Sequence, residues 1–144
     1  MSNIDTVKEG LRAWEKNDAA TMNSLIADSF VLSGPVPQPL GKQEFIGFMH
    51  AILAALPDFK FNETGFEEHG DKVVIKSRIS GTQTGTLALP GMPPVPATGK
   101  KVALPEERQE YTLSGGKLVK LVVDEVPGGG VPGMLAQLGV QLPH

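Results

Sequence analysis

The chain has 144 residues, a formal net charge of −3 at pH 7, twelve prolines, seventeen glycines and no cysteine. This length fits one domain over residues 1–144, and the absence of cysteine excludes disulfides, thiolate metal sites and a cysteine nucleophile. Charges of both signs are mixed without a basic run, which argues against nucleic acid as a partner. The N-terminus lacks a signal-peptide pattern and no apolar run approaches the ~20 residues of a membrane span, so we expect a cytoplasmic protein with no membrane contact.

The first part of the chain has the pattern of helices. Apolar residues recur at spacings of three and four over residues 4–16 and 42–56, which predicts two amphipathic helices. Asp18 is a favourable N-cap for a short helix between them. A short strand is expected at residues 30–32. The proline-rich segment 34–41 is interpreted as a lid or connector, because its prolines exclude a helix.

The rest of the chain has the pattern of a sheet. Alternating apolar residues predict β-strands over residues 59–68, 71–89, 102–113 and 118–126. Ser114, Gly115 and Gly116 predict a tight antiparallel hairpin, because glycine reaches positive φ without steric cost. Pro105 predicts a bulge or an edge position within its run. A short helix is expected from Pro132 to Leu138.

The last β-run has apolar residues on both of its expected faces. Strict alternation places Leu118 and Val122 on one face and Leu121 and Val123 on the other. Helices on one side of a sheet bury only one face, and a large exposed apolar face is unusual in a monomer. This pattern therefore predicts a homodimer that forms through the outer face of the sheet.

The order of these elements indicates an α+β fold in which helices cover one side of a curved antiparallel sheet. The chain also resembles the SnoaL-like polyketide cyclases and ester cyclases of the nuclear-transport-factor-2-like (NTF2-like) superfamily. The segments that carry the resemblance, in chain order, are Trp14 before Asp18, Ala27-Asp28-Ser29-Phe30, Gly41-Lys42-Gln43-Glu44-Phe45, Leu56-Pro57-Asp58-Phe59, Gly81-Thr82-Gln83-Thr84-Gly85, Ala97-Thr98-Gly99-Lys100, Gly116-Lys117-Leu118 and Gln137-Leu138-Gly139-Val140.

The resemblance implies a cone-shaped fold, also described as a cystatin-like roll, with frequent homodimers and a hydrophobic pocket between the long helix and the concave sheet. It implies an intramolecular aldol closure that uses a carboxylate base and a hydrogen-bond donor for the enolate oxygen, without a metal or organic cofactor. The chain has Gln83 where the family often has histidine, and Val122 where the family has tryptophan.

Asp124 and Gln83 are the candidate catalytic residues. Asp124 shares the expected strand face of Val122, and in an apolar cavity its pKa would rise to suit a general base. The alternative is a strand-end aspartate in water or paired with Lys120. Gln83 falls on a covered face, where its amide donates either to a ligand oxyanion or to neighbouring backbone groups.

The candidate substrate-binding residues are Trp14, Phe48, Arg78, Tyr111 and Val122. Trp14 and Tyr111 are equally consistent with core packing, and Arg78 with a solvated sheet face. Three functions stay open: an acid/base cyclase, isomerase or lyase acting on an apolar, polyketide-like molecule; a non-catalytic protein that binds such a molecule; and a dimerisation module whose cone is filled by its own side chains.

Overall fold

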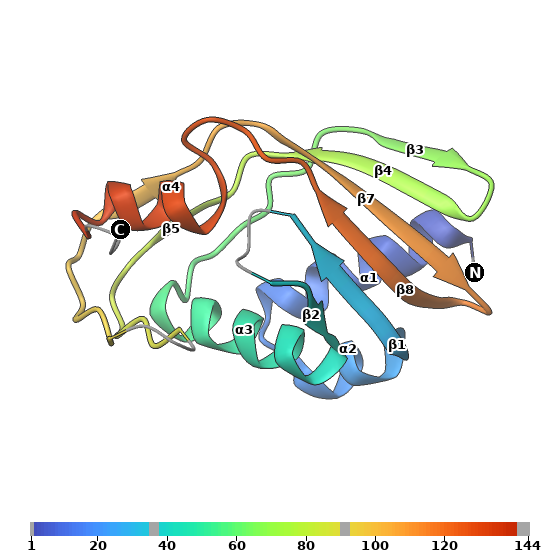
Figure 1. Ribbon diagram of the computed structural model, residues 1–144, viewed down its shortest axis with the longest axis horizontal. Helices are drawn as coiled ribbons and strands as arrows, with labels where there is room; N and C mark the ends of the chain where they lie inside the picture. Colours follow the sequence, from blue (N-terminus) through green and yellow to red (C-terminus); the bar gives the residue numbers. More distant parts are fainter. Residues whose placement is uncertain (1, 35–37, 90–92, 141–144) are drawn as a thin grey trace.

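The computed structural model describes residues 2–34, 38–89 and 93–140 (Figure 1). Its helices are α1 (Asn3–Glu15), α2 (Ala19–Leu25), α3 (Lys42–Ala55) and α4 (Gly130–Gln137). Its strands are β1 (Ile26–Ser33), β2 (Leu40–Gly41), β3 (Phe66–His69), β4 (Lys72–Ser77), β5 (Ser80–Thr82), β6 (Lys101–Ala103), β7 (Glu107–Ser114) and β8 (Lys117–Val123). The expected lid at 34–41 lies partly outside the described residues.

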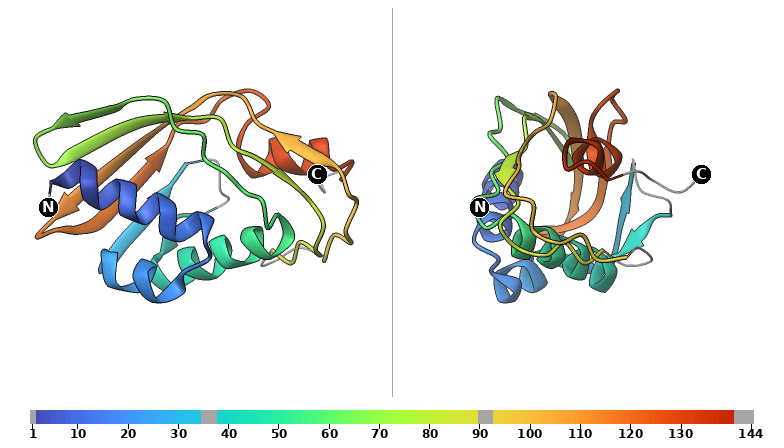
Figure 2. Two further views of the ribbon diagram at one scale, coloured as in Figure 1. Left: turned by 180° about the vertical axis from the view of Figure 1, so that it is seen from behind. Right: turned by 90° about the vertical axis from the view of Figure 1, so that its left-hand side faces the viewer.

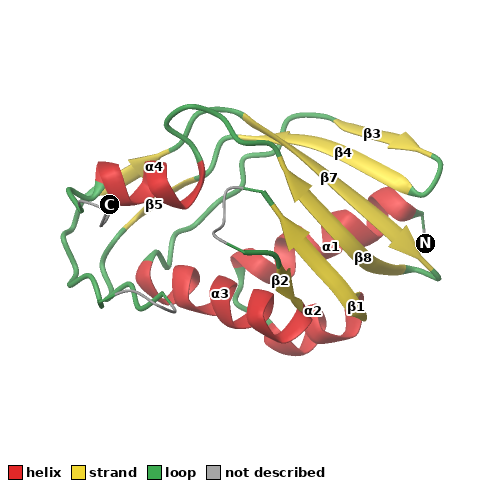
Figure 3. Ribbon diagram, viewed as in Figure 1, coloured by secondary structure: helices red, strands yellow, loops and turns green. Residues whose placement is uncertain are grey.

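Six strands form a curved sheet in the order β2-β1-β8-β7-β4-β3, and β5 and β6 form a separate two-stranded sheet (Figure 3). All neighbours in the large sheet are antiparallel except β1 and β8, which run parallel. Helices α1 and α3 cover the same side of the sheet, with α1 against β3 and β4 and α3 against β1 (Figure 2). The α+β architecture expected from the sequence is confirmed.

Helices α1, α2 and α3 begin within one residue of their predicted starts, and α4 begins two residues before Pro132. Ser2 caps α1 through a capping box, in which its Oγ accepts from the backbone N of Asp5 at 3.1 Å. Asp18 caps α2 by accepting from the backbone N of Thr21 at 3.1 Å. No helix among residues 2–34, 38–89 and 93–140 has the length and apolar character of a membrane span.

Two predicted strands are each divided in two. The run 71–89 forms β4 and then β5, because after Ser77 the chain leaves the large sheet and the backbone N of Arg78 donates to the carbonyl of Phe61 at 3.0 Å. The run 102–113 is interrupted around Pro105, which lies between β6 and β7. Alternation alone does not reveal these breaks, since both halves keep the same period of two.

The strand boundaries differ from the prediction at two further places. Phe59 and Phe61 are buried but lie in a loop, and the expected strand over 59–68 shortens to β3. The backbone turns at Asn62, whose φ is 50°, so the extended run ends there. Strand β1 is longer than the strand expected at residues 30–32 and starts at Ile26.

A β-bulge in β8 changes which residues share a face. Tyr111 pairs with Leu121 and Leu113 with Leu118, so one extra residue lies between these pairs on β8. As a result Leu118 and Leu121 are both buried on the concave side, whereas strict alternation placed them on opposite faces. The prediction of two continuous apolar faces is therefore wrong for β8.

The outer face of the sheet carries ion pairs. Glu110 lies 3.3 Å from Lys72 and 3.2 Å from Arg108, and Arg108 lies 3.9 Å from Asp124. Among the described residues, Val31 is the only large apolar side chain that is exposed. The free outer surface is thus more polar than the sequence pattern indicated.

Candidate functional site

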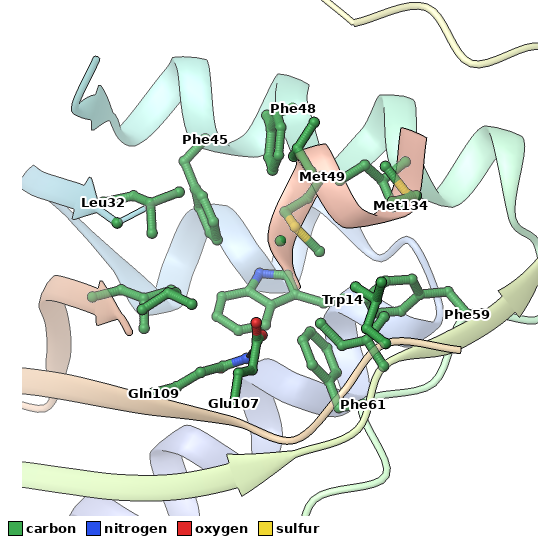
Figure 4. Close-up of a pocket in the computed structure, with 18 of the residues that line it drawn as sticks. Trp14, Leu32, Phe45, Phe48, Met49, Phe59, Phe61, Glu107, Gln109 and Met134 are labelled. Atoms are coloured by element: carbon green, nitrogen blue, oxygen red, sulfur yellow. Dashed lines mark hydrogen bonds between the residues drawn. The ribbon is translucent and has the colours of Figure 1, made fainter. Parts of the chain in front are cut away.

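An apolar cavity of about 110 Å³ lies between α1, α3, α4 and the concave face of the sheet (Figure 4). Aromatic and aliphatic side chains make up nearly all of its lining. The lining residues are Trp14, Leu32, Ser33, Gly34, Phe45, Phe48, Met49, Ile52, Phe59, Phe61, Ile79, Leu104, Glu107, Gln109, Tyr111, Leu121, Val123, Gly130, Val131 and Met134. Such a cavity suits a small apolar molecule.

The cavity's polar side chains come mainly from β7. Glu107, Gln109 and Tyr111 occupy alternate positions of this strand, so all three point to the concave side and are buried. Tyr111 Oη donates to Gln109 Oε1 at 2.6 Å, and Gln109 Nε2 donates to Glu107 Oε1 at 2.9 Å. Gln109 Nε2 also donates to Ser77 Oγ at 3.1 Å. This chain of hydrogen bonds fixes the orientation of the Glu107 carboxyl group.

The carboxyl group of Glu107 is buried among mainly apolar side chains. The residue is 4% exposed, and burial raises the pKa of its carboxyl group, which the hydrogen bond from Gln109 partly opposes. Because Oε1 accepts from Gln109, the proton of the neutral acid belongs on Oε2. Among the described residues, no hydrogen bond engages Oε2. The group therefore combines a raised pKa with an oxygen that is free to exchange a proton.

Tyr111 and Trp14 form the wall beside Glu107. Burial, together with the charges of Glu107 and Glu63, raises the pKa of Tyr111 well above its ordinary value, so its hydroxyl stays protonated. The Trp14 ring stacks on Tyr111 with centroids 6.0 Å apart and meets the edge of Phe45 at 5.3 Å. These contacts hold the indole in one orientation at the cavity.

A family model described as the SnoaL-like domain matches residues 7–121. The chain belongs to the SnoaL-like domain family. A comparison with curated protein sequences found no match.

Solved structures of low sequence identity share the fold. IdmH from Streptomyces antibioticus, a proposed polyketide cyclase, is 23% identical over 97% of this chain and 100% of its own, with a TM-score of 0.72. AclR from Streptomyces galilaeus, a proposed hydroxylase, is 20% identical over 98% and 97%, with a TM-score of 0.75. An LEH-like epoxide hydrolase from M. tuberculosis is 12% identical over 95% and 92%, with a TM-score of 0.71. These likenesses confirm the NTF2-like fold of the SnoaL-like chain.

Three of the substrate-binding candidates of this SnoaL-like domain lie at the cavity. Trp14 and Tyr111 are fully buried in its wall, and the half-buried Phe48 lines it from α3. Arg78 and Val122 are not among the lining residues. Arg78 is exposed after β4, and Val122 pairs with Glu110 on the outer side of the sheet.

Asp124 lies outside the cavity. Its side chain is 46% exposed, and its nearest charged partner is Arg108 on the outer face, at 3.9 Å. The expectation placed Asp124 on the cavity face because it assumed unbroken alternation from Leu118. The bulge in β8 shifts the register by one residue, so that Leu118 and Val123 both face the concave side. Asp124, the next residue after Val123, therefore lies on the outer side.

Gln83 is fully buried but uses its amide to hold a loop. Its Nε2 donates to the carbonyls of Val95 and Pro96 at 3.1 and 3.2 Å. Its Oε1 accepts from the backbone N and the hydroxyl of Thr98 at 3.2 and 2.7 Å. The contacts correspond to the second alternative of the sequence analysis, in which the amide bonds neighbouring backbone groups.

The sequence analysis missed Glu107 and Gln109. The signal that identifies them is their spacing from Tyr111, since residues two and four positions before a buried tyrosine share its strand face. Arg108 and Glu110 occupy the intervening positions of β7, and their side chains lie on the outer face. The described residues contain no group of three His, Asp or Glu side chains arranged to hold a metal ion.

Proposed function

We propose that this SnoaL-like protein binds an uncharged, largely apolar small molecule in the cavity and transfers a proton to or from it through Glu107. One observation carries the proposal: a buried carboxyl group, with a raised pKa and one unengaged oxygen, lines an otherwise apolar cavity. Strongly perturbed carboxyl groups inside pockets are candidates for acid/base catalysis. The reaction class is that of a cyclase, isomerase or lyase.

The proposed step is proton abstraction from a carbon next to a carbonyl group. Ionised Glu107 Oε2 takes the proton, the C–H bond breaks, and its electron pair moves to the carbonyl oxygen as an enolate. The enolate carbon then attacks a second carbonyl of the same molecule: a C–C bond forms, the C=O π bond breaks, and the resulting alkoxide takes the proton back from Glu107. In the isomerase alternative, the neutral acid returns the proton at another carbon of the enolate. A base whose pKa lies nearer to neutrality than that of ordinary glutamate suits this task.

The chain of hydrogen bonds on β7 supports the same role. Gln109 donates to Oε1, which keeps Oε2 toward the cavity, and Tyr111 fixes the Gln109 amide in the required orientation. A positioned base is more effective than a mobile one, because less orientational entropy is lost in the transition state. The polyketide-like class of substrate is proposed from the family and from the description of IdmH as a proposed polyketide cyclase.

Two competing proposals use the same fold. In the first, Asp124 is the base and Gln83 the oxyanion donor, as expected from the strand faces in the sequence. In the second, the protein binds its ligand without catalysis, which the nearly complete apolar lining favours.

The cytoplasmic location and the homodimer through the outer face remain proposals. The homodimer rests on Val31 and Val122 beside the ion pairs of the outer face, and light scattering at micromolar concentration tests it.

Solvent exchange into a simple ketone tests the proton transfer without the natural substrate. The probe is tetralone in heavy water, followed by NMR as deuterium replaces the protons next to its carbonyl. We expect Glu107→Gln to lower the protein-catalysed rate by about 100-fold or more, because general bases contribute on this scale. Asp124→Asn is the matched control and should exchange like the unaltered protein.

The outcomes separate the proposals, once thermal unfolding shows that both variants are folded. If Asp124→Asn lowers the rate of deuterium exchange and Glu107→Gln does not, Asp124 is the base. Tetralone that binds but exchanges no faster than in buffer would favour the non-catalytic alternative.

A further inference from the structure

Trp14 carries a polar group that the fold leaves without a partner. Its side chain is 1% exposed, yet among the described residues its indole Nε1 has no hydrogen-bond acceptor. Buried N–H groups are nearly always paired, because the energy of the hydrogen bond to water is otherwise lost. An unpaired donor in a cavity wall therefore needs an explanation.

The surroundings of the indole explain why no protein group accepts from it. Phe45, Phe61 and Tyr111 contact the ring, with centroid distances of 5.3, 5.7 and 6.0 Å. Figure 4 shows the nitrogen on the ring edge turned toward Phe45 and Met49, while the Glu107 carboxyl group points toward the same ring from β7. Aromatic and aliphatic side chains thus surround the N–H, and no described residue presents an acceptor to it.

The cavity also lacks positive charge. None of the described lining residues is a lysine, arginine or histidine, and its one acidic side chain is Glu107. A ligand carboxylate would lose its hydration without gaining a cation, and it would lie near a second carboxyl group. A neutral oxygen acceptor has neither penalty.

We propose that Trp14 Nε1 donates a hydrogen bond to an oxygen of the ligand, and that this bond selects neutral carbonyl compounds over hydrocarbons and carboxylates of the same shape. This inference rests on the proposed function, because it concerns the ligand of the same cavity. Trp14 is then a specificity-determining residue as well as part of the wall. A buried donor discriminates well, since a ligand without an acceptor leaves it unpaired.

A matched pair of probes tests the inference. Tetralone and tetralin share one ring skeleton and differ in a carbonyl in place of a methylene, and tetralin carboxylate adds the charged case. Trp14 is the only tryptophan in the chain, so a ¹⁵N-labelled sample has one indole N–H signal. We expect tetralone to move this signal downfield and to bind roughly 5- to 10-fold more tightly than tetralin, and the carboxylate to bind weakest.

A substitution of the single N–H supplies the control. Growth of a tryptophan auxotroph on benzothienylalanine replaces the N–H of Trp14 with sulfur and leaves the rest of the chain unchanged. Calorimetry should then show tetralone binding reduced to the level of tetralin, with tetralin binding unaltered. A variant that has lost its fold is recognised because it also fails to bind tetralin.

Each outcome decides a different point. Equal affinities for tetralone and tetralin, with no selective shift of the indole signal, would overturn the role of Trp14 and leave apolar binding in the cavity intact. Failure of all three probes to bind the unaltered protein would overturn both the inference and the proposed function. Selective tetralone binding without deuterium exchange would uphold the role of Trp14 and remove the proton transfer.

Discussion

Glu107 Oε1 accepts a hydrogen bond from Gln109 Nε2 at 2.9 Å, and both residues are buried on one face of β7. The hydrogen bond takes up one carboxyl oxygen and leaves the other for the cavity. The proposed proton transfer by Glu107 depends on this arrangement, because it gives the carboxyl group a fixed orientation and a raised pKa in an apolar cavity.

The stability of the protein should depend on pH through Glu107. Burial raises the pKa of Glu107, so between its unfolded and folded pKa values the folded state holds a proton that the unfolded state has lost. The stabilisation that comes from this proton is fully present below the pKa of Glu107 in the unfolded state. It is lost as the pH rises through the pKa of Glu107 in the folded state. Glu107→Gln lacks this pH dependence. Its free energy of unfolding relative to that of the unaltered protein should therefore rise with pH, by about 1.4 kcal/mol for each pH unit between the two pKa values.

Urea unfolding of both proteins from about pH 4 to about pH 8 measures this difference. Asp124→Asn is the control for the loss of one carboxylate, because Asp124 lies outside the cavity, 3.9 Å from Arg108. Parallel profiles for the unaltered protein and Glu107→Gln would contradict the raised pKa.

Tyr111→Phe should destabilise the protein although it leaves the ring in place. The change removes the hydroxyl that donates to Gln109 Oε1 at 2.6 Å and leaves a buried acceptor without its donor. We expect a loss of about 1–3 kcal/mol in the free energy of unfolding. Urea denaturation checks this, and an unchanged midpoint would show that Gln109 finds another partner.

Gln83→Ala should lower stability without removing proton transfer. The substitution eliminates all four hydrogen bonds that tie Gln83 to residues 95–98. A cost of about 2–4 kcal/mol follows from several lost buried bonds of ordinary strength. At a temperature where the variant is folded, tetralone exchange should match that of the unaltered protein, whereas lost exchange with normal stability would make Gln83 the oxyanion donor.

Two glycine-to-alanine substitutions, one within α3 and one in a loop that packs against α3, should have opposite effects on stability. A Cβ at Gly85 would lie 2.4 Å from the carbonyl oxygen of Ala54 in α3, so Gly85→Ala should destabilise by about 1–3 kcal/mol. A Cβ at Gly47 meets nothing within 4 Å, and Gly47→Ala should stabilise α3 by up to about 1 kcal/mol. Thermal unfolding measures both, and equal effects would contradict the close packing of Gly85 on α3.

The elements with local signals were predicted well from the sequence. Asp18 caps α2 as expected, and Gly115 and Gly116 have φ values of 58° and 79° in the predicted hairpin. The family resemblance, which rested on short segments along the chain, is confirmed by the match over residues 7–121. Capping and turn residues act within a few positions, so a single sequence contains their signal.

The position of the candidate site was harder to predict because it depends on register. One extra residue in β8 puts Leu118 and Leu121 on the same face of the sheet, although strict alternation placed them on opposite faces. The same shift places Asp124 on the face opposite the cavity. No residue type marks this bulge in the sequence. Glu107 was missed for a related reason: its face is defined by Tyr111, and burial of a tyrosine is a tertiary property.

Proton transfer by Glu107 is tested by following the titration of its carboxyl group together with the rate of deuterium exchange. Its carboxyl carbon, assigned by comparison with Glu107→Gln, is followed by ¹³C NMR across pH, and tetralone exchange is measured in the same samples. We expect the carboxyl group to titrate with a midpoint above that of an ordinary glutamate, and the exchange rate to rise with the same midpoint, because the ionised form is the base. A carboxyl group that titrates in the ordinary range, or exchange that rises independently of it, would contradict the account.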